Sequence, residues 1–289
     1  MRILITGATG NVGIEVIRAI DASDHSHQVY AGLRDVKKKD LALEAFPDIQ
    51  QRKFDFDITT DFQIYLKDMD VLFLLRPPHI SDVDKHFRPL IEAAKEVRLK
   101  HIVFLSVQGV EKSSIIPHYK IEKLIKQSGL AYTFLRPAYF MQNFSTTLRK
   151  DIIEKNRVFL PAGKAKFNLI DVKDVGEVAA KVLIDAAEHK HKAYDLTNGE
   201  QMDFESMCAV LSEVIGRKID FISPNLFSFF FQKRKEGTAI PFILVMIMLH
   251  YLPKFQKTLP TSDWAERLLG RAPATFAEFV KREQITWVL

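Results

Sequence analysis

The sequence is poor in cysteine, with Cys208 as the single example among 289 residues. One cysteine cannot form an intramolecular disulfide or supply a thiolate cluster for zinc or for iron and sulfur. Histidine offers no replacement, because His189 and His191 stand two apart without a third ligand at suitable spacing. We therefore predict no metal site, and we expect a protein of the reducing cytoplasm.

Long apolar runs and a strong charge of one sign are also missing. The most apolar stretch, 239–252, contains Pro241 and His250 and falls short of the roughly 20 residues that a membrane-spanning helix needs. We expect it to be a buried helix rather than a membrane contact. The 41 basic and 36 acidic residues are scattered along the chain, for a net charge of +5. This balance indicates no nucleic-acid surface and no membrane partner. Neither do the first residues have the pattern of a signal peptide.

The remaining pattern is an alternation of apolar runs of strand length with segments of helical period. Such an alternation is typical of a parallel sheet built by helical crossovers. The sequence therefore predicts an α/β fold of the Rossmann type, with a doubly wound parallel sheet. The expected strands are 2–6, 28–33, 51–55, 71–75, 101–106 and 131–136, and the expected helices are 12–20, 87–97, 114–127 and 172–187.

The alternation loosens beyond about residue 140, and after Asp203 the chain is mainly of helical period with a phenylalanine-dense stretch at 221–231. We expect a dinucleotide-binding domain over 1–145 and a smaller, mainly helical C-terminal substrate lobe over 146–289. A last strand near 193–197 is expected to return to the first domain. The two parts would then be interleaved in sequence.

A glycine-rich turn, Thr6 to Gly13, directly follows the first expected strand and opens the first helix. Gly7 would allow the tight turn, Gly10 would let the backbone approach a pyrophosphate, and Gly13 would let the helix pack closely on the strand. The free N–H groups at the helix start favour phosphate. The residues predicted to bind a dinucleotide here are Gly7, Thr9, Gly10, Asn11, Val12 and Gly13.

Arg34, at the end of the second strand, indicates which nicotinamide cofactor the chain prefers. An acidic residue at this position bonds the ribose hydroxyl of NAD, whereas an arginine accommodates the extra phosphate of NADP. Asp35 comes one step later and is expected to point away, so we predict a preference for NADP(H) over NAD(H). Asp57 and Ile58, after the third strand, are placed to edge the adenine ring, although Asp57 fits a loop or capping carboxylate equally well.

Further motifs follow along the chain: 74–78, 118–122, 128–137, 140–144, 170–175 and 270–276. Together with the glycine turn they resemble the NmrA-like, NAD(P)H-binding branch of the atypical short-chain dehydrogenases. This resemblance implies that Leu75, Arg76, Pro77 and Pro78 line the cofactor groove. It also implies that Pro137 to Phe140 lie beside the nicotinamide.

The catalytic residue depends on the alignment of one helix. Tyr119 and Lys123 have the Tyr-x-x-x-Lys spacing of short-chain dehydrogenases, in which the lysine lowers the tyrosine pKa. The spacing of Glu122 and Gly129 instead puts His118 at the lysine position and Ser114 at the tyrosine position, so that the pair is absent. We prefer this second alignment.

In that alignment His118 is a candidate proton donor, as is Tyr139, and Ser106 at the end of the fifth strand would orient the substrate. All three residues also fit purely structural roles.

Three functions fit these features. The first is an NADPH-dependent oxidoreductase that transfers hydride to a small electrophile such as a quinone, enone or carbonyl compound. The second is a regulatory protein that senses NADP(H) without turnover and passes the state to a protein partner. A sugar-nucleotide epimerase is a weaker third, since it would want the tyrosine base and NAD. The oligomeric state stays open.

Overall fold

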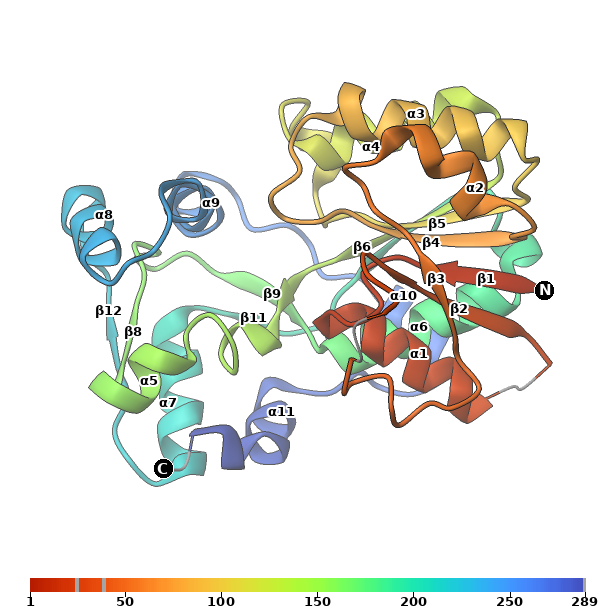
Figure 1. Ribbon diagram of the computed structural model, residues 1–289. Coiled ribbons are helices and arrows are strands. Elements are labelled where there is room, and N and C mark those ends of the chain that lie inside the picture. Colours follow the sequence, from red (N-terminus) through yellow and green to blue (C-terminus); the bar gives the residue numbers. More distant parts are fainter. Residues whose placement is uncertain (24–25, 38–39, 288–289) are drawn as a thin grey trace. The chain divides into compact units, whose positions relative to one another are not determined.

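The computed structural model describes residues 1–23, 26–37 and 40–287, and the chain forms two compact units (Figure 1). Unit 1 comprises Met1–Pro137, Val172–Leu196 and Trp264–Ala272, and unit 2 comprises Ala138–Asp171, Thr197–Asp263 and Pro273–Leu289. The chain thus leaves unit 1 at Pro137 and returns to it twice. The second return, Trp264–Ala272, falls in the stretch 146–289 that the sequence assigns to the substrate lobe.

Unit 1 is built on a seven-stranded, fully parallel sheet in the order β10-β6-β5-β4-β1-β2-β3. This confirms the Rossmann-type fold. The strand bounds are β1 Arg2–Ile5, β2 Gln28–Leu33, β3 Gln50–Lys53, β4 Val71–Leu75, β5 His101–Leu105, β6 Tyr132–Pro137 and β10 Lys192–Leu196.

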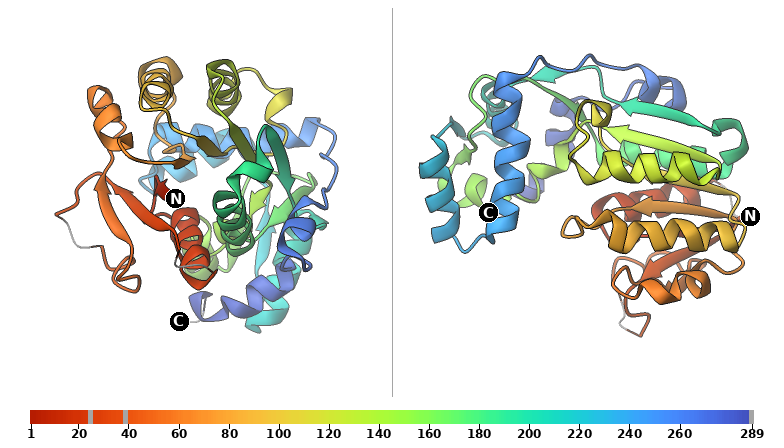
Figure 2. Two further views of the ribbon diagram at one scale, coloured as in Figure 1. Left: turned by 90° about the vertical axis from the view of Figure 1, so that its right-hand side faces the viewer. Right: turned by 90° about the horizontal axis from the view of Figure 1, so that it is seen from above.

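Helices cover both faces of this sheet (Figures 1 and 2). Helices α2 (Phe62–Leu66), α3 (Val83–Glu96) and α4 (Pro117–Ser128) cover one face, and α1 (Asn11–Ser23) and α6 (Val172–Ile184) cover the other. The short α10 (Trp264–Leu269) packs against α6 and β10. The apolar faces of α2, α3 and α4 share one core with the sheet. In that core lie Leu90, Ile91 and Ala94 of the apolar stripe that the helical period of 87–97 predicts.

The strand order reverses between β1 and β4. Thr6 ties these two strands together at their carboxyl ends, since its Oγ1 donates to the Phe73 carbonyl at 3.0 Å and accepts from the Leu75 N–H at 2.8 Å. In open α/β sheets, ligands bind outside the carboxyl ends of the strands at such a reversal. The glycine-rich turn starts at this point.

Unit 2 combines two small sheets with helices. The three-stranded sheet has the order β11-β9-β7 and the two-stranded sheet pairs β12 with β8. Its strands are β7 Tyr139–Phe140, β8 Arg157–Phe159, β9 Phe167–Ile170, β11 Gln201–Met202 and β12 Asp220–Ile222, and its helices are α5 Arg149–Lys155, α7 Phe204–Ile215, α8 Leu226–Lys235, α9 Ile240–Tyr251 and α11 Phe276–Arg282.

The core of unit 2 is rich in aromatic rings. Phe144, Phe204 and Phe276 stack or meet edge to face within it. Trp287 is fully buried there, and its Nε1 donates to the Phe144 carbonyl at 3.0 Å. The other tryptophan, Trp264, belongs to unit 1, where its ring meets that of Tyr194 at 4.9 Å.

Helix α9 corrects one expectation. The stretch 239–252 does form a helix, but only Ile243, Met246 and His250 are buried in it. Ile247 is half-buried against the core of unit 2, and six other large apolar side chains of the helix are exposed, Leu244 to 55%. The expectation of a buried helix was wrong because composition reveals apolar character without telling which faces are covered. Within the described part of the chain, no helix combines the length and hydropathy needed to span a bilayer.

Candidate functional site

The glycine-rich turn folds as its sequence predicts. Gly7 has a left-handed φ of 62°, and the Gly10 N–H donates to the Gly7 carbonyl at 2.9 Å. The Ile14 N–H then donates to the Gly10 carbonyl at 3.0 Å and continues into α1. A left-handed φ is costly for residues with a side chain, so Gly7 is required by conformation.

Gly13 is required by space. A Cβ on Gly13 would lie 2.2 Å from the Gly7 carbonyl oxygen and 2.8 Å from the Ala8 Cα. A Cβ on Gly10 would lie 3.2 Å from the same oxygen. The turn and the first turn of α1 therefore lie too close together for a side chain at residue 13.

A groove of about 190 Å³ opens beside this turn, entirely within unit 1. Five predicted cofactor residues line it: Gly7, Thr9, Arg34, Asp57 and Pro77. Eight further residues complete the wall and had escaped the sequence reading: Ala8, Gly32, Leu33, Phe54, Asp55, Phe56, His79 and Ile80. They follow or end strands β1 to β4, so the strand order would have been the signal to find them.

Arg34 is exposed at the end of β2, in the wall of this groove. The neighbouring Asp35 accepts the Lys37 N–H at 2.9 Å in a local turn. Asp57 is exposed, and its N–H donates to the Asp55 carboxylate at 3.0 Å. Ile58 is half-buried and does not line the groove. A cation and two carboxylates thus face the same groove.

The segment after β4 is held by Arg76. The guanidinium donates to the carbonyls of Pro77, Pro78 and Ile80 at 3.0, 3.1 and 2.6 Å. Leu75 instead contacts the glycine turn, since its Cδ2 would lie 3.2 Å from a Cβ on Gly7. Within this loop only Pro77 and Ile80 line the groove together with exposed His79. Arg76 acts as the clamp that shapes the wall.

His118 lies in the first turn of α4, half-buried against Phe104. Arg76 Nε donates to His118 Nε2 at 3.5 Å. Burial, and secondly the charge of Arg76, lower the pKa of His118 to about 3. The ring is therefore neutral near pH 7 and offers its Nδ1 as donor. An imidazolium proton donor at this position is disfavoured.

The rest of α4 leaves both alignments open. Glu122, one turn on from His118, accepts from Arg136 at 2.7 and 3.0 Å. Tyr119 is half-buried, and Ser114 is exposed just before the helix. Glu122 thus has a structural partner in Arg136.

Ser106 follows β5 and is 5% exposed. Its N–H donates to the Leu135 carbonyl at 2.7 Å, whereas its Oγ has no hydrogen-bond partner. Buried hydroxyls are nearly always bonded, so this oxygen is available to a ligand. Pro137, the last residue of β6, is buried, and its carbonyl accepts the Gln108 N–H at 3.0 Å.

Tyr139 belongs to unit 2 and has a partner that the sequence did not suggest. His250 Nδ1 bonds the Met246 carbonyl at 2.7 Å, so the Nδ1 carries the proton and Nε2 accepts from the Tyr139 hydroxyl at 3.1 Å. Burial raises the pKa of Tyr139 above its ordinary value, and burial lowers the pKa of His250 to about 4. The Tyr139 proton is thus held by a neutral histidine from α9.

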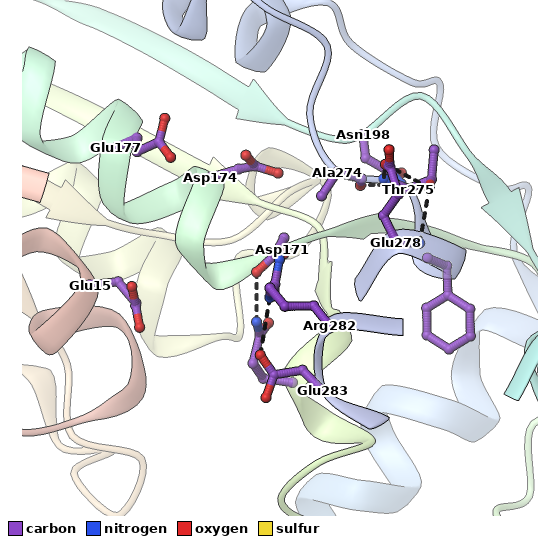
Figure 3. Close-up of polar contacts among 12 residues, drawn as sticks. Glu15, Asp171, Asp174, Glu177, Asn198, Ala274, Thr275, Glu278, Arg282 and Glu283 are labelled. Carbon is purple, nitrogen blue, oxygen red and sulfur yellow. Dashed lines mark hydrogen bonds and ion pairs between the residues drawn. The ribbon is translucent and has the colours of Figure 1, made fainter. Parts of the chain in front are cut away.

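Several motif residues near the carboxyl end serve packing (Figure 3). In unit 2, Asp171 accepts from Arg282 at 2.7 Å and from Gln142 at 2.6 Å. Thr275 starts α11 with a capping box to Glu278. In unit 1, the buried Asp174 pairs with Arg271 at 2.9 Å. These contacts stabilise each unit separately.

The chain is similar over nearly its whole length to known proteins in both sequence and structure. Prestalk A differentiation protein A of Dictyostelium discoideum is 30% identical over 283 residues, covering 97% of this chain and 92% of its own. NAD(P)H azoreductase of Xenophilus azovorans is 27% identical over 289 residues and 96% of each chain. The crystal structure of Citrobacter sp. triphenylmethane reductase complexed with NADP(H) is 25% identical, with a TM-score of 0.85 over 98% of this chain and 99% of that one.

The model of the NmrA-like family matches residues 1–256. This match spans the glycine turn, the β4 loop, α4 and most of unit 2. The chain therefore belongs to the NmrA-like family.

Proposed function

We propose that the chain is an NADPH-dependent oxidoreductase that transfers hydride to a small electrophile such as a quinone, enone or carbonyl compound. The observation that carries this proposal is the glycine turn opening into a groove with Arg34 in its wall. The azoreductase and dye reductase among its relatives act on conjugated acceptors by name and support the same chemistry.

In this proposal Gly7 to Gly13 hold the pyrophosphate at the start of α1, and Arg34 contacts the additional phosphate of NADP. Asp57 edges the adenine, and Pro77 flanks the remainder in a wall that Arg76 shapes. The reduced nicotinamide supplies the hydride. Ser106, whose buried Oγ is unbonded, orients the acceptor, and Tyr139 or His118 supplies the proton.

Cofactor preference is tested by titrating the cofactor-free protein with NADPH and NADH and following cofactor fluorescence. We expect tighter binding of NADPH. Arg34→Ala should weaken NADPH about tenfold, because one charge-assisted bond to phosphate is lost, and should leave NADH unchanged. Arg88→Ala, at an exposed arginine of α3, is the matched control. Equal loss for both cofactors would remove Arg34 from the phosphate site.

The sensing function is the second candidate, and two observations favour it. His118 is held neutral beside Arg76, and the Tyr139 proton is committed to His250. Both groups are thus already bonded within the fold, and a function without turnover needs neither proton. In this alternative the cofactor state is passed to a protein partner. The epimerase alternative has no comparable support. Arg34 favours NADP, and the preferred alignment of α4 contains no Tyr-Lys pair.

Turnover separates the candidates. NADPH oxidation is measured with quinones and enones for the wild type, Ser106→Ala, His118→Ala and Tyr139→Phe, with NADPH affinity measured for each. The reductase function predicts turnover that falls in Ser106→Ala and in at least one of the other two while cofactor affinity is kept. Cofactor binding without turnover across the acceptor series would contradict the reductase and leave the sensor.

A further inference from the structure

Helices α8 and α9 pack against each other in unit 2 (Figure 1). Both carry exposed apolar side chains. Ten large apolar side chains between residues 227 and 255 are exposed, more than half of those exposed in the described chain. We call these ten the apolar surface: Phe227, Phe231, Ile240, Phe242, Leu244, Val245, Met248, Leu249, Leu252 and Phe255.

The apolar surface is not an ordinary water-facing helix surface. Helix α9 contains no Asp, Glu, Lys or Arg, whereas a surface helix normally presents charged residues to water. On α8, Phe227 and Phe231 stand one helical turn apart and are 79% and 67% exposed. Exposed patches of this kind mark a binding surface.

Basic residues flank the apolar surface on both sides in the chain. Segment 221–262 has five basic residues and one acidic residue, a net charge of +4 within a chain of +5. The acidic one, Glu236, is already bound by Lys155 and Lys233. Arg234 and Lys235 before α9, and Lys254 and Lys257 after it, are exposed cations.

We propose that this surface docks on an anionic lipid surface, which replaces the prediction from the sequence that the chain has no membrane partner. Apolar side chains flanked by lysine and arginine suit the boundary between acyl chains and anionic head groups, where the rings enter the bilayer and the cations stay at the phosphates. No spanning helix is needed for such docking. The inference concerns a surface of unit 2 and does not rest on the proposed oxidoreductase function.

A second copy of the chain fits this surface less well. In a two-fold interface the same patch meets itself, so the basic flanks would oppose each other and Glu236 is already paired within its own chain. An anionic membrane neutralises the flanks instead. Charge therefore favours lipid.

The test is co-sedimentation of the full chain with vesicles of phosphatidylcholine alone and of phosphatidylcholine mixed with phosphatidylserine. We expect binding to the mixed vesicles that weakens at raised salt and little binding to the neutral ones. Lys235→Gln with Lys257→Gln should weaken partition about fivefold for each lysine. Phe227→Gln with Phe231→Gln and Phe255→Gln should abolish it, and circular dichroism checks the fold.

Matched controls come from equally exposed residues elsewhere. Ile64→Gln with Ile115→Gln, and Lys95→Gln with Lys150→Gln, should bind as the wild type does. Equal binding to neutral vesicles, binding unaffected by the phenylalanine changes, or no binding would each overturn the proposal. Sedimentation velocity tests whether a second copy of the chain occupies the surface instead. A dimer that the phenylalanine changes abolish, without vesicle binding, would assign the surface to a second copy.

Discussion

At the scale of single residues, the glycine turn depends on the lack of a side chain at residue 13. Gly13 has no Cβ, and a methyl group there would overlap the Gly7 carbonyl at 2.2 Å. The oxygen belongs to the backbone of the turn itself and cannot move aside like a flexible side chain. Any relief would have to open the cradle that we propose for the pyrophosphate.

We predict that Gly13→Ala lowers the free energy of unfolding by about 2 kcal/mol through overpacking and weakens NADPH binding at least tenfold. Denaturant unfolding and cofactor titration check the two effects. Gly129→Ala is the control, since Gly129 has a φ of 77° but no atom within 4 Å of a new Cβ. It should lose stability through backbone strain yet bind cofactor normally. Normal binding by Gly13→Ala would contradict the assignment of the turn.

At the scale of elements, a cluster of charges around the buried Asp151 and Lys233 joins α8 to α5. Lys233 Nζ donates to Asp151 and Glu236 at 2.8 Å each, and Lys155 Nζ donates to the same two carboxylates at 2.9 and 2.6 Å. Arg157 stands at the edge, 3.8 Å from Glu236. The cluster fixes the helix that carries Phe227 and Phe231.

Burial alone would raise the pKa of Glu236, but the hydrogen bonds from Gln232, Lys155 and Lys233 outweigh it and lower the pKa to about 2. A carboxylate with a lowered folded pKa stabilises the protein above its ordinary pKa, and this stabilisation is lost as the pH falls towards the folded value. The window for Glu236 therefore runs from 4.5 down to about 2.

We predict that Glu236→Gln costs about 2 kcal/mol of unfolding free energy near neutral pH, because two lysines lose a charged partner. Wild type and variant should converge as the pH falls through that window. Urea unfolding followed by circular dichroism measures both. Glu154→Gln, at an exposed glutamate of α5, should change stability by less than about 0.5 kcal/mol. A constant gap at all pH values would show that the charge of Glu236 is irrelevant.

The elements also show where sequence reasoning ends. Glycine spacing and apolar period predicted β1, the turn and α1, because these depend on neighbours in the chain. Arg34 and Asp57 could be placed for the same reason. The partner of Tyr139 could not, since His250 is 111 residues away. The groove residues that follow β3 and β4 could not be predicted either, because this needs the order of the strands in the sheet. A local sequence pattern does not contain that order.

At the scale of the whole molecule, buried neutral histidines make stability depend on pH. His101 is 2% exposed, its Nε2 bonds Thr133 Oγ1 at 2.9 Å, and its Nδ1 has no partner. Burial, followed by the charges of Lys190, His191 and His189, lowers its pKa to about 4. His118 and His250 are lowered in the same direction, one in each unit.

A histidine with a lowered folded pKa takes up its proton only on unfolding, so the unfolded state gains as the pH falls below 6.5. Each such group contributes a slope of about 1.4 kcal/mol per pH unit until its folded pKa is reached. We predict that His101→Gln, which can keep the bond to Thr133, reduces the slope of unfolding free energy between pH 6.5 and about 4 by this amount.

Urea unfolding at several pH values measures the slope. His79→Gln, at an exposed histidine, is the control and should leave the slope unchanged. If His101→Gln also left it unchanged, the ring would already be protonated or accessible in the folded protein.

The two tryptophans fall one in each unit, Trp264 in α10 and Trp287 in the core of unit 2. Since the sequence contains no others, tryptophan emission has only two sources, one 37% exposed and one fully buried. Replacing either by phenylalanine leaves an optical reporter of a single unit. The emission of the two single-tryptophan variants would thus show whether the two interleaved units unfold in one transition or in two.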